Sequence, residues 1–201
     1  MNLDDAIKQI RIVENKKKFS QSIDLIINLT NADMKKPENK ITKDVALPHG
    51  RGKEIKVGII SDSIKGSITK ADIQNIETDK KAAKKFGRDC DYFVCEAALM
   101  AYVGKALGRY LSPAGKMPKP IMPGMDAKKM VDTLSKSVKI RTKDSPVIHC
   151  VIGTETMTDQ QIKENAAKVI EEVKKALPGK VQIKNGYIKL SMGKPAKIDI
   201  R

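Results

Sequence analysis

The segment LPHGRGKEIKVGII (residues 47–60) decides the fold, because one structural pattern ends in it and another begins. Upstream, SIDLIINL (22–29) alternates apolar and polar residues, which is typical of a strand with one buried face. Downstream, IKVGII (55–60) is an almost continuous apolar run, which indicates a strand covered on both faces. The glycine-rich, charged link between them therefore predicts a boundary between two domains.

The middle of the chain alternates strands with helices. DYFVCEAALM contains a second apolar strand at Tyr92–Cys95, and helical patterns fall near residues 79–87, 97–108 and 126–136. Strands that alternate with helices are typical of a parallel sheet with helices on its faces. We therefore expect residues 55–136 to form a small Rossmann-like domain.

The rest of the chain returns to an antiparallel pattern. VKIRTKDSPVIHCVI (138–152) indicates a hairpin with TKDSP as its turn. MTDQQIKENAAKVIEEVKKAL indicates a helix, with Thr158 and Gln161 as a capping box and Pro178-Gly179 as its stop. In the last strand, Asn185-Gly186 separates two apolar patterns of opposite parity, which predicts a β-bulge.

Neither end of the chain can bury its apolar face alone, because each contributes too few elements to enclose a core. Together the ends supply two helices and about four or five antiparallel strands. The sequence therefore predicts a two-domain fold that combines α+β and α/β structure. Residues 1–54 and 137–201 would form one discontinuous domain, a split β-α-β-like antiparallel fold, into which the Rossmann-like parallel-sheet domain of residues 55–136 is inserted. LPHGRGKE and LSKSVK would be the paired hinges.

Composition points to a polyanionic partner. Lysine and arginine number 39 against 24 acidic residues, for a formal net charge of +15. This balance favours nucleic acid or an acidic membrane surface, although a basic protein without such a partner would show it too. Aromatic residues make up only 3%, too few for a protein that stacks unpaired bases on its rings. Folded RNA, bound through its backbone, 2′-hydroxyls and shape, fits this composition better.

Several other classes of protein are disfavoured. Cys90, Cys95 and Cys150 make no disulfide framework and indicate reduced thiols in a cytoplasmic protein. The segment MNLDDAIKQIRIVENKKKF is amphipathic, unlike a signal peptide, and no apolar run approaches the roughly 18 residues of a membrane span. His49 and His149 form no metal or catalytic pattern with the cysteines, and LPHGRGK matches no phosphate-binding loop. We therefore expect no enzyme activity, no metal, no cofactor and no membrane association.

Two segments carry the candidate contacts. LSMGKP (190–195) ends the last strand with a hydroxyl, a flexible thioether and a glycine, which would suit a flat surface against a ribose edge. In KKKFSQSID (16–24), three lysines could hold phosphates while Phe19 packs on a sugar. The alternatives are a strand end with Met192 in the core, and lysines that end the first helix beside a buried Phe19. A further basic helical face, more often simply solvated, would consist of Lys81, Lys84, Lys85 and Arg88.

Several phrases, taken together and in order, resemble the L-one family of large-subunit ribosomal proteins in its archaeal form. They are FSQSIDLIINL, DMKKPENKI, LPHGRGKE, GRYLSPAGKMPKP, MTDQQIKENAAKVIEEV and YIKLSMGKPAKI, and they span residues 19–198. That family has two domains, the first of them discontinuous. The resemblance implies a ribosomal protein that binds folded large-subunit rRNA mainly through the split domain and forms the mobile lateral stalk beside the tRNA exit site. It also implies assistance in release of deacylated exit-site tRNA, repression of the chain's own mRNA, and a monomer off the ribosome.

The resemblance further implies which residues face the RNA. They lie at the start of the first long strand, in and after the hairpin turn, and in a threonine- or serine-Met-Gly element: Lys18, Phe19, Ser22, Asp144, His149, Ser191, Met192, Gly193 and Lys194. Lys194 stands where the family usually has proline, and Ser112 and Ala114 depart from its common Gly-Pro-Arg-Gly pattern. Two other classes stay open: a non-ribosomal basic nucleic-acid-binding protein, such as a nucleoid-type DNA binder, and a nucleotide-dependent enzyme that uses the inserted sheet.

Overall fold

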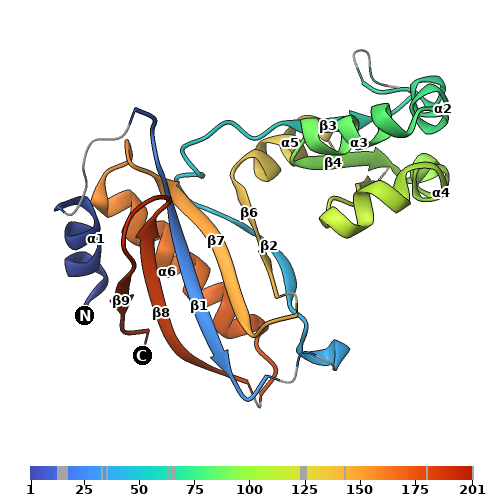
Figure 1. The fold of residues 1–201 in the computed structure, drawn as a ribbon. Helices are drawn as coiled ribbons and strands as arrows, with labels where there is room; N and C mark the ends of the chain where they lie inside the picture. Colours follow the sequence, from blue (N-terminus) through green and yellow to red (C-terminus); the bar gives the residue numbers. More distant parts are fainter. Residues whose placement is uncertain are drawn as a thin grey trace. The chain divides into compact units, whose positions relative to one another are not determined.

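The computed structural model separates into two compact units, which we call the split unit and the insert (Figure 1). The split unit comprises Met1–Lys53 and Lys136–Arg201, and the insert comprises Glu54–Ser135. The residues that the structure describes are 1–12, 18–32, 34, 36–62, 64, 67–122, 126–142, 144–179 and 181–200. Among these residues, no helix combines the length and apolar character needed to cross a membrane.

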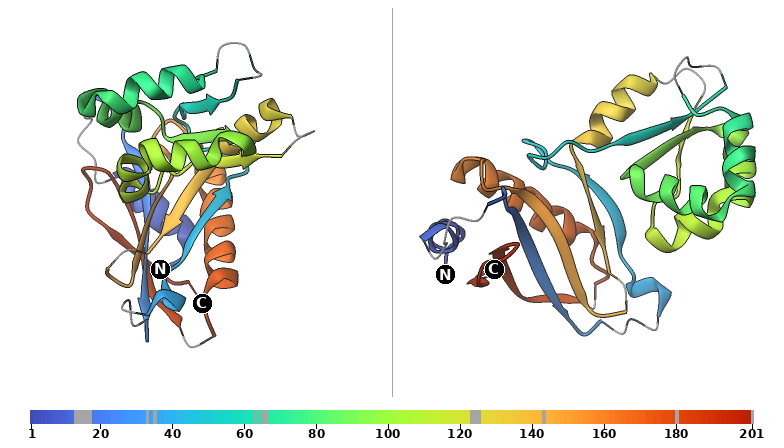
Figure 2. Two further views of the ribbon diagram at one scale, coloured as in Figure 1. Left: turned by 90° about the vertical axis from the view of Figure 1, so that its right-hand side faces the viewer. Right: turned by 45° about the horizontal axis from the view of Figure 1, so that its top comes forward.

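The split unit is built on a four-stranded antiparallel sheet in the order β7-β1-β8-β9. Its strands are β1 (Ser22–Thr30), β7 (Val147–Thr154), β8 (Gln182–Leu190) and β9 (Ala196–Ile198). The helices α1 (Leu3–Ile12) and α6 (Asp159–Ala176) lie on the same side of this sheet (Figures 1 and 2). We call the opposite side, which these helices leave uncovered, the open face.

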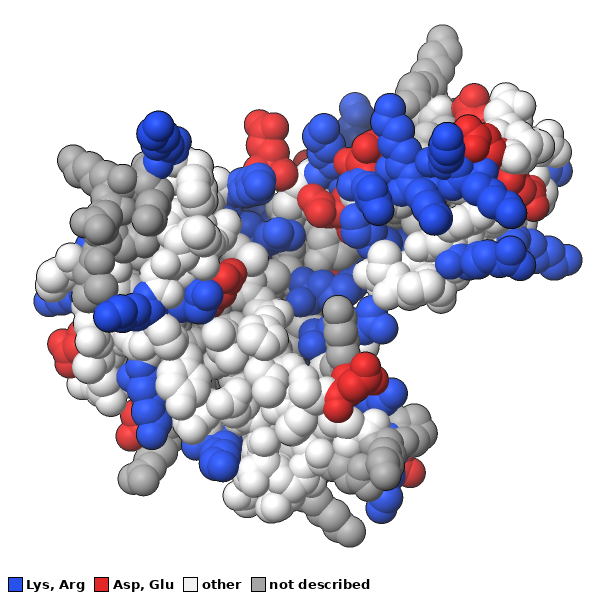
Figure 3. Space-filling model, in the orientation of Figure 1, with Lys and Arg blue, Asp and Glu red and all other residues white. Residues whose placement is uncertain are grey.

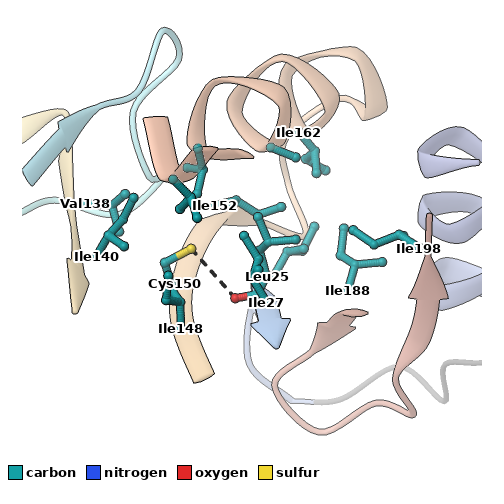
Figure 4. Close-up of a cluster of buried hydrophobic side chains, with 14 of the residues drawn as sticks. Leu25, Ile27, Val138, Ile140, Ile148, Cys150, Ile152, Ile162, Ile188 and Ile198 are labelled. Carbon is teal, nitrogen blue, oxygen red and sulfur yellow. Dashed lines mark hydrogen bonds between the residues drawn. The ribbon is translucent and has the colours of Figure 1, made fainter. Parts of the chain in front are cut away.

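The core of the split unit is the covered face of this sheet. Ile23, Leu25 and Ile27 of β1 each have 0% exposure, as the alternating pattern predicted. They pack with inward side chains of α1 and α6 and with β2 (Thr42–Ala46) and β6 (Ser137–Arg141), a separate two-stranded sheet (Figure 4). Burying one side chain of this size stabilises a protein by roughly 1.5–3 kcal/mol, so this layer holds segments together that are far apart in the sequence.

The pairing of β6 corrects the predicted hairpin. β6 and β7 flank the expected turn, but β6 pairs with β2, with Val138 opposite Val45 and Arg141 opposite Thr42. β2 leads the chain toward the insert and β6 brings it back, so the two strands meet where the chain leaves and re-enters the split unit. Apolar alternation predicts that a strand exists, but it does not identify the partner strand.

β8 contains the predicted bulge. Asn28 pairs with Asn185 whereas Leu29 pairs with Ile183, so the extra residue is Lys184, one position before the expected site. Before the bulge the core-facing residue of β8 has an odd number, Ile183, and after it the core-facing residues have even numbers, Ile188 and Leu190. The side chains on both sides of the bulge therefore face the same core. The bulge explains why an otherwise regular strand breaks its alternation.

The insert has a three-stranded parallel sheet in the order β3-β4-β5, as the alternation of strands and helices predicted. Its elements are β3 (Val57–Ile60), α2 (Lys70–Thr78), α3 (Lys80–Asp89), β4 (Tyr92–Glu96), α4 (Ala97–Ala114), β5 (Lys119–Ile121) and α5 (Ala127–Ser135). Phe93 packs against side chains of α2, α3 and α4, whereas Val94 packs against Leu134 of α5. Because β4 is covered on both faces, its sequence is apolar without alternation.

Two helices of the insert differ from expectation. The sequence pattern did not predict α2, because Ile73 is its one fully buried residue and the helix therefore has almost no apolar stripe. A capping box between Thr69 and Asp72 starts it instead. α4 runs beyond the expected end at residue 108 and stops at Gly115, which has a φ of 69° and caps the last turn.

The end of the first helix differs from the prediction at Lys18. The described part of α1 reaches Ile12, and Lys18, the next described residue, lies outside the helix in an exposed position. Lys16 and Lys17, which were expected to end it, lie outside the described residues. Lys18 is therefore not a C-terminal residue of α1, and stabilisation of a helix end does not account for it.

Candidate RNA-binding surface

Two distant parts of the predicted site meet at one end of the sheet. Ser191 follows β8 and Ser22 begins β1, and 169 residues separate them in the sequence. The backbone oxygen of Ser22 accepts hydrogen bonds from the backbone nitrogen of Ser191 at 3.0 Å and from its Oγ at 3.2 Å. Antiparallel pairing of β1 with β8 thus brings the SMG sequence to the start of the first strand.

A buried glutamine holds the turn after β8. Gln21 is 1% exposed, and its Oε1 accepts a hydrogen bond from the backbone nitrogen of Met192 at 3.1 Å. The backbone nitrogen of Gly193 donates to the oxygen of Leu190 at 2.9 Å, which closes the turn. We call the surface formed by Ser22, Ser191, Met192 and Gly193, together with the buried Gln21 that holds its turn, the ledge. Its backbone is fixed before any partner arrives, so binding would require little further ordering.

The side chains beside the ledge point outward. Met192 is 68% exposed and Phe19 is 53% exposed, so the alternatives that placed them in the core are wrong. Lys18 and Lys194 are exposed as well. Large apolar side chains that are exposed to water, each close in sequence to an exposed lysine, are typical of a contact surface rather than of an ordinary strand end.

Gly193 does not adopt a left-handed conformation. The described glycines with positive φ are Gly50, Gly52 and Gly115. A glycine at this position could serve either a turn with positive φ or the close approach of a partner to its backbone. The first alternative is therefore wrong, and the second stays a prediction.

The remaining predicted residues lie away from the ledge. His149 is exposed in the middle of β7, opposite Ile26. Asp144 is exposed in the turn before β7, near the far end of β1. Seven residues of extended strand separate Ser22 from Leu29 at that end, which corresponds to roughly 20 Å. The structure therefore groups the predicted residues at the two ends of β1 and in the middle of the open face.

The open face adds polar groups that sequence reasoning missed. Asp24 lies opposite Lys189 of β8, and burial raises the pKa of its carboxyl, while the charges of Lys189 and His149 act in the other direction. Asn28 Nδ2 donates to Asn185 Oδ1 across the strands at 2.8 Å. Figure 3 shows a largely uncharged surface over these strands, with scattered Lys and Arg. Amide and hydroxyl groups on a flat face suit 2′-hydroxyls and base edges better than phosphates.

The LPHGRGK loop has a structural role within the split unit. Asn165 of α6 has 0% exposure, and its Nδ2 donates to the oxygens of Gly50 at 2.9 Å and Ile152 at 2.8 Å. Its Oδ1 accepts a hydrogen bond from the backbone nitrogen of His49 at 3.2 Å. A Cβ at Gly52 would collide with the side chain of Thr154. Gly52 therefore serves close packing within the split unit, and both Gly50 and Gly52 have a positive φ, which favours glycine.

Both buried polar residues had a signal in the sequence. Gln21 has the same parity as Ile23 and Leu25, so it continues the buried face of β1. Asn165 lies within the apolar stripe of α6, beside Ala166. A polar side chain on a buried face needs hydrogen-bond partners, and those partners are backbone groups of other segments, which no sequence pattern identifies.

The thiols do not form a reactive site. Cys150 is buried in the core of the split unit, where its Sγ donates to the oxygen of Leu25 (Figure 4), and burial raises its pKa to about 12. Burial, with the nearby charges of Glu96 and Asp62, raises the pKa of Cys95 to about 11. The described residues contain no group of three or more His, Cys, Asp or Glu side chains that could hold a metal ion.

Comparison with known proteins places the chain in a family. Residues 8–194 match the model of the ribosomal protein L1p/L10e family. The large ribosomal subunit protein uL1 of Thermofilum pendens is 41% identical, with 98% of this chain and 92% of the relative covered. The same protein of Thermoplasma volcanium is 37% identical, with 98% and 97% covered, and that of Methanothermococcus thermolithotrophicus is 36% identical, with 98% of each covered. The chain therefore belongs to the ribosomal protein L1p/L10e family.

Proposed function

We propose that this chain is a protein of the large ribosomal subunit and that it binds folded large-subunit rRNA through the ledge and the open face. The observation that carries the proposal is the exposed pair Met192 and Phe19, beside a turn whose backbone Gln21 holds in place. The names of the relatives, each a large ribosomal subunit protein, support the ribosomal assignment.

Recognition of RNA shape is the mode that this surface suits. The minor groove of an RNA helix is wide and shallow and displays 2′-hydroxyls. At Gly193 no side chain keeps the protein backbone from a ribose, and Met192 adds an adaptable apolar contact. Lys18 and Lys194, both exposed near the ledge, would hold phosphates on either side.

Three finer roles belong to the same proposal. The chain would form part of the mobile lateral stalk beside the tRNA exit site, assist release of deacylated tRNA, and repress translation of its own mRNA. These roles rest on the resemblance of its motifs to the family. Repression requires that the mRNA fold into a shape that fits the same ledge, so one surface would serve both RNAs.

The test compares two glycine variants of the full chain. Gly193→Val adds a side chain where the ledge would meet RNA. Gly179→Val is the matched control, because a Cβ at this exposed position meets nothing within 4 Å. Gly193→Val should weaken binding of the folded rRNA segment by at least about tenfold, equivalent to about 1.4 kcal/mol. The control should bind like the parent chain, and thermal melts should show both variants folded.

Two outcomes would overturn the proposal. Unchanged binding by folded Gly193→Val would exclude the ledge as the contact. Equal affinity of the parent chain for the rRNA segment and for unrelated duplex DNA would favour a non-ribosomal basic nucleic-acid-binding protein.

A further inference from the structure

One face of α3 in the insert is positively charged. Lys81, Lys84, Lys85 and Arg88 are all exposed, and spacings of three and four residues place them on the same side of the helix. Along the helix axis they extend over about 10 Å, at roughly 1.5 Å per residue. Figure 3 shows Lys and Arg gathered over this part of the insert.

These charges are arranged against the local electrostatics of the helix. Lys80 and Lys81 occupy the first turn, where the helix dipole favours acidic residues, and this turn contains no acid. Within the described part of the chain, none of the α3 lysines nor Arg88 takes part in an ion pair. Like charges three and four residues apart repel each other, so α3 is less stable than its composition of good helix formers would allow.

The other long lysine-rich helix of this chain is built differently. In α6, Lys168 and Lys175 pair with Glu171 and Glu172 at N–O distances of 2.5 to 3.7 Å. Lys168 and Lys175 are thus paired within α6, whereas the α3 cations form no ion pair among the described residues, although Asp79 caps that helix and Asp89 ends it. A helix that retains repulsion among its own cations is stabilised when an external polyanion binds.

The chemistry of this face fits a phosphate backbone better than an acidic protein. All exposed residues of α3 are charged, and its apolar side chains, at Ala82, Ala83 and Phe86, are buried or half-buried. Protein interfaces usually contain an apolar or aromatic centre, which α3 does not offer. Duplex nucleic acid presents one charge per ~1.7 Å of its axis, a density that closely spaced cations can match.

We propose that α3 is a second RNA-binding surface, which holds the phosphate backbone of duplex RNA without regard to sequence. It differs from the ledge in chemistry, because the ledge is fixed by hydrogen bonds and carries few charges, whereas α3 offers a row of cations. It also lies in the other unit of the chain. The inference therefore does not depend on the ledge and can be tested with a plain RNA duplex of arbitrary sequence.

The test uses the full chain with Lys81→Gln, Lys84→Gln and Lys85→Gln combined. The matched control combines Lys8→Gln, Lys128→Gln and Lys174→Gln, which removes the same charge at exposed positions of α1, α5 and α6. Binding of an RNA duplex of arbitrary sequence is measured between about 50 and 200 mM salt. The slope of log K against log salt should become shallower by about 2 to 3 units in the α3 variant, at roughly 0.9 per phosphate contact, and by less than about 1 in the control.

A second readout locates the contact directly. Chemical acetylation of the parent chain, followed by mass spectrometry, should show that duplex RNA protects Lys81, Lys84 and Lys85 more than Lys8, Lys128 and Lys174. Equal losses in the two variants would mean that binding follows net charge alone, which would overturn the proposal. An unchanged slope in the α3 variant would overturn it too, and would leave an acidic protein as the partner to test. Gly193→Val tests the ledge separately, so the two proposals can fail independently.

Discussion

Met192 and Leu190 are two residues apart but have opposite surroundings. Leu190 is 1% exposed at the end of β8, whereas Met192 is 68% exposed. Met192→Ala should therefore change the free energy of unfolding by less than about 0.5 kcal/mol, whereas truncating a buried side chain costs about 2–5 kcal/mol. Affinity for folded rRNA should fall severalfold, because an apolar contact at the ledge is lost.

Thermal melts and RNA titrations check both halves of this prediction. Met122→Ala is the control, since Met122 is 64% exposed and lies in the insert. A Met192→Ala protein that melts much earlier than the parent but binds RNA normally would remove Met192 from the ledge.

Asn165 should matter far more for stability. Its amide makes three hydrogen bonds, to Gly50, Ile152 and His49. Asn165→Ala should lower the free energy of unfolding by about 2–4 kcal/mol, because each buried group left unpaired costs about 1–3 kcal/mol. Gln160→Ala, which removes an exposed hydrogen bond to Glu164 on the same helix, is the control and should cost little. Urea unfolding of both variants measures the difference. Equal losses in the free energy of unfolding would contradict the conclusion that the hydrogen bonds of Asn165 stabilise the loop against α6.

At the scale of single elements, the charges of α6 predict a response to acid. The hydrogen bond from Lys43, with a further one from Lys168, lowers the pKa of Glu172 from 4.5 to about 2. A lowered carboxyl pKa stabilises the folded state above pH 4.5, and this stabilisation is lost as the pH falls toward 2. Lys43 belongs to β2 and Glu172 to α6, so this ion pair links the strand to the helix, and its loss at low pH would weaken that link.

Glu172→Gln should therefore flatten the dependence of stability on pH within this range. Glu77→Gln, at an exposed position of α2, is the control and should leave the pH dependence as in the parent chain. Urea midpoints measured at successive pH values test this, at low salt because ions screen exposed pairs. Parallel curves for the parent chain and Glu172→Gln would exclude Glu172 as the source.

Elements could be predicted from sequence where a long segment packs on one core. β1 and α6 have regular apolar positions over 9 and 18 residues, and both were predicted. β9 was missed because its three residues, Ala196–Ile198, are too few for a periodic pattern. The same holds for the candidate site. The exposed residues of the ledge could be predicted from their types in the sequence. The role of Gln21 could not, because its hydrogen-bond partner Met192 lies 171 residues away.

At the scale of the whole molecule, the net charge of +15 predicts strong dependence on salt. Affinity for folded rRNA should fall as salt rises, because each phosphate contact releases counterions. Lys18→Ala should make the log–log slope shallower by about one unit, since one contact contributes roughly 0.9. Lys8→Ala, at an exposed position of α1, should leave the slope as it is. An identical slope for the parent chain and Lys18→Ala would place Lys18 outside the phosphate contacts.

The strand order β7-β1-β8 has a consequence for the chain during its synthesis. β1 is made first, but both of its neighbours in the sheet come after the insert. All three strands of the insert, in contrast, are made before β6 begins, so its parallel sheet can form while β1 still has no partner. The ledge joins Gln21 to Met192 and cannot exist until residue 192 has left the synthesising ribosome and β8 has paired. A nascent chain is therefore unable to use the ledge before that point, and the RNA binding that we propose there would begin only after β8 has paired with β1.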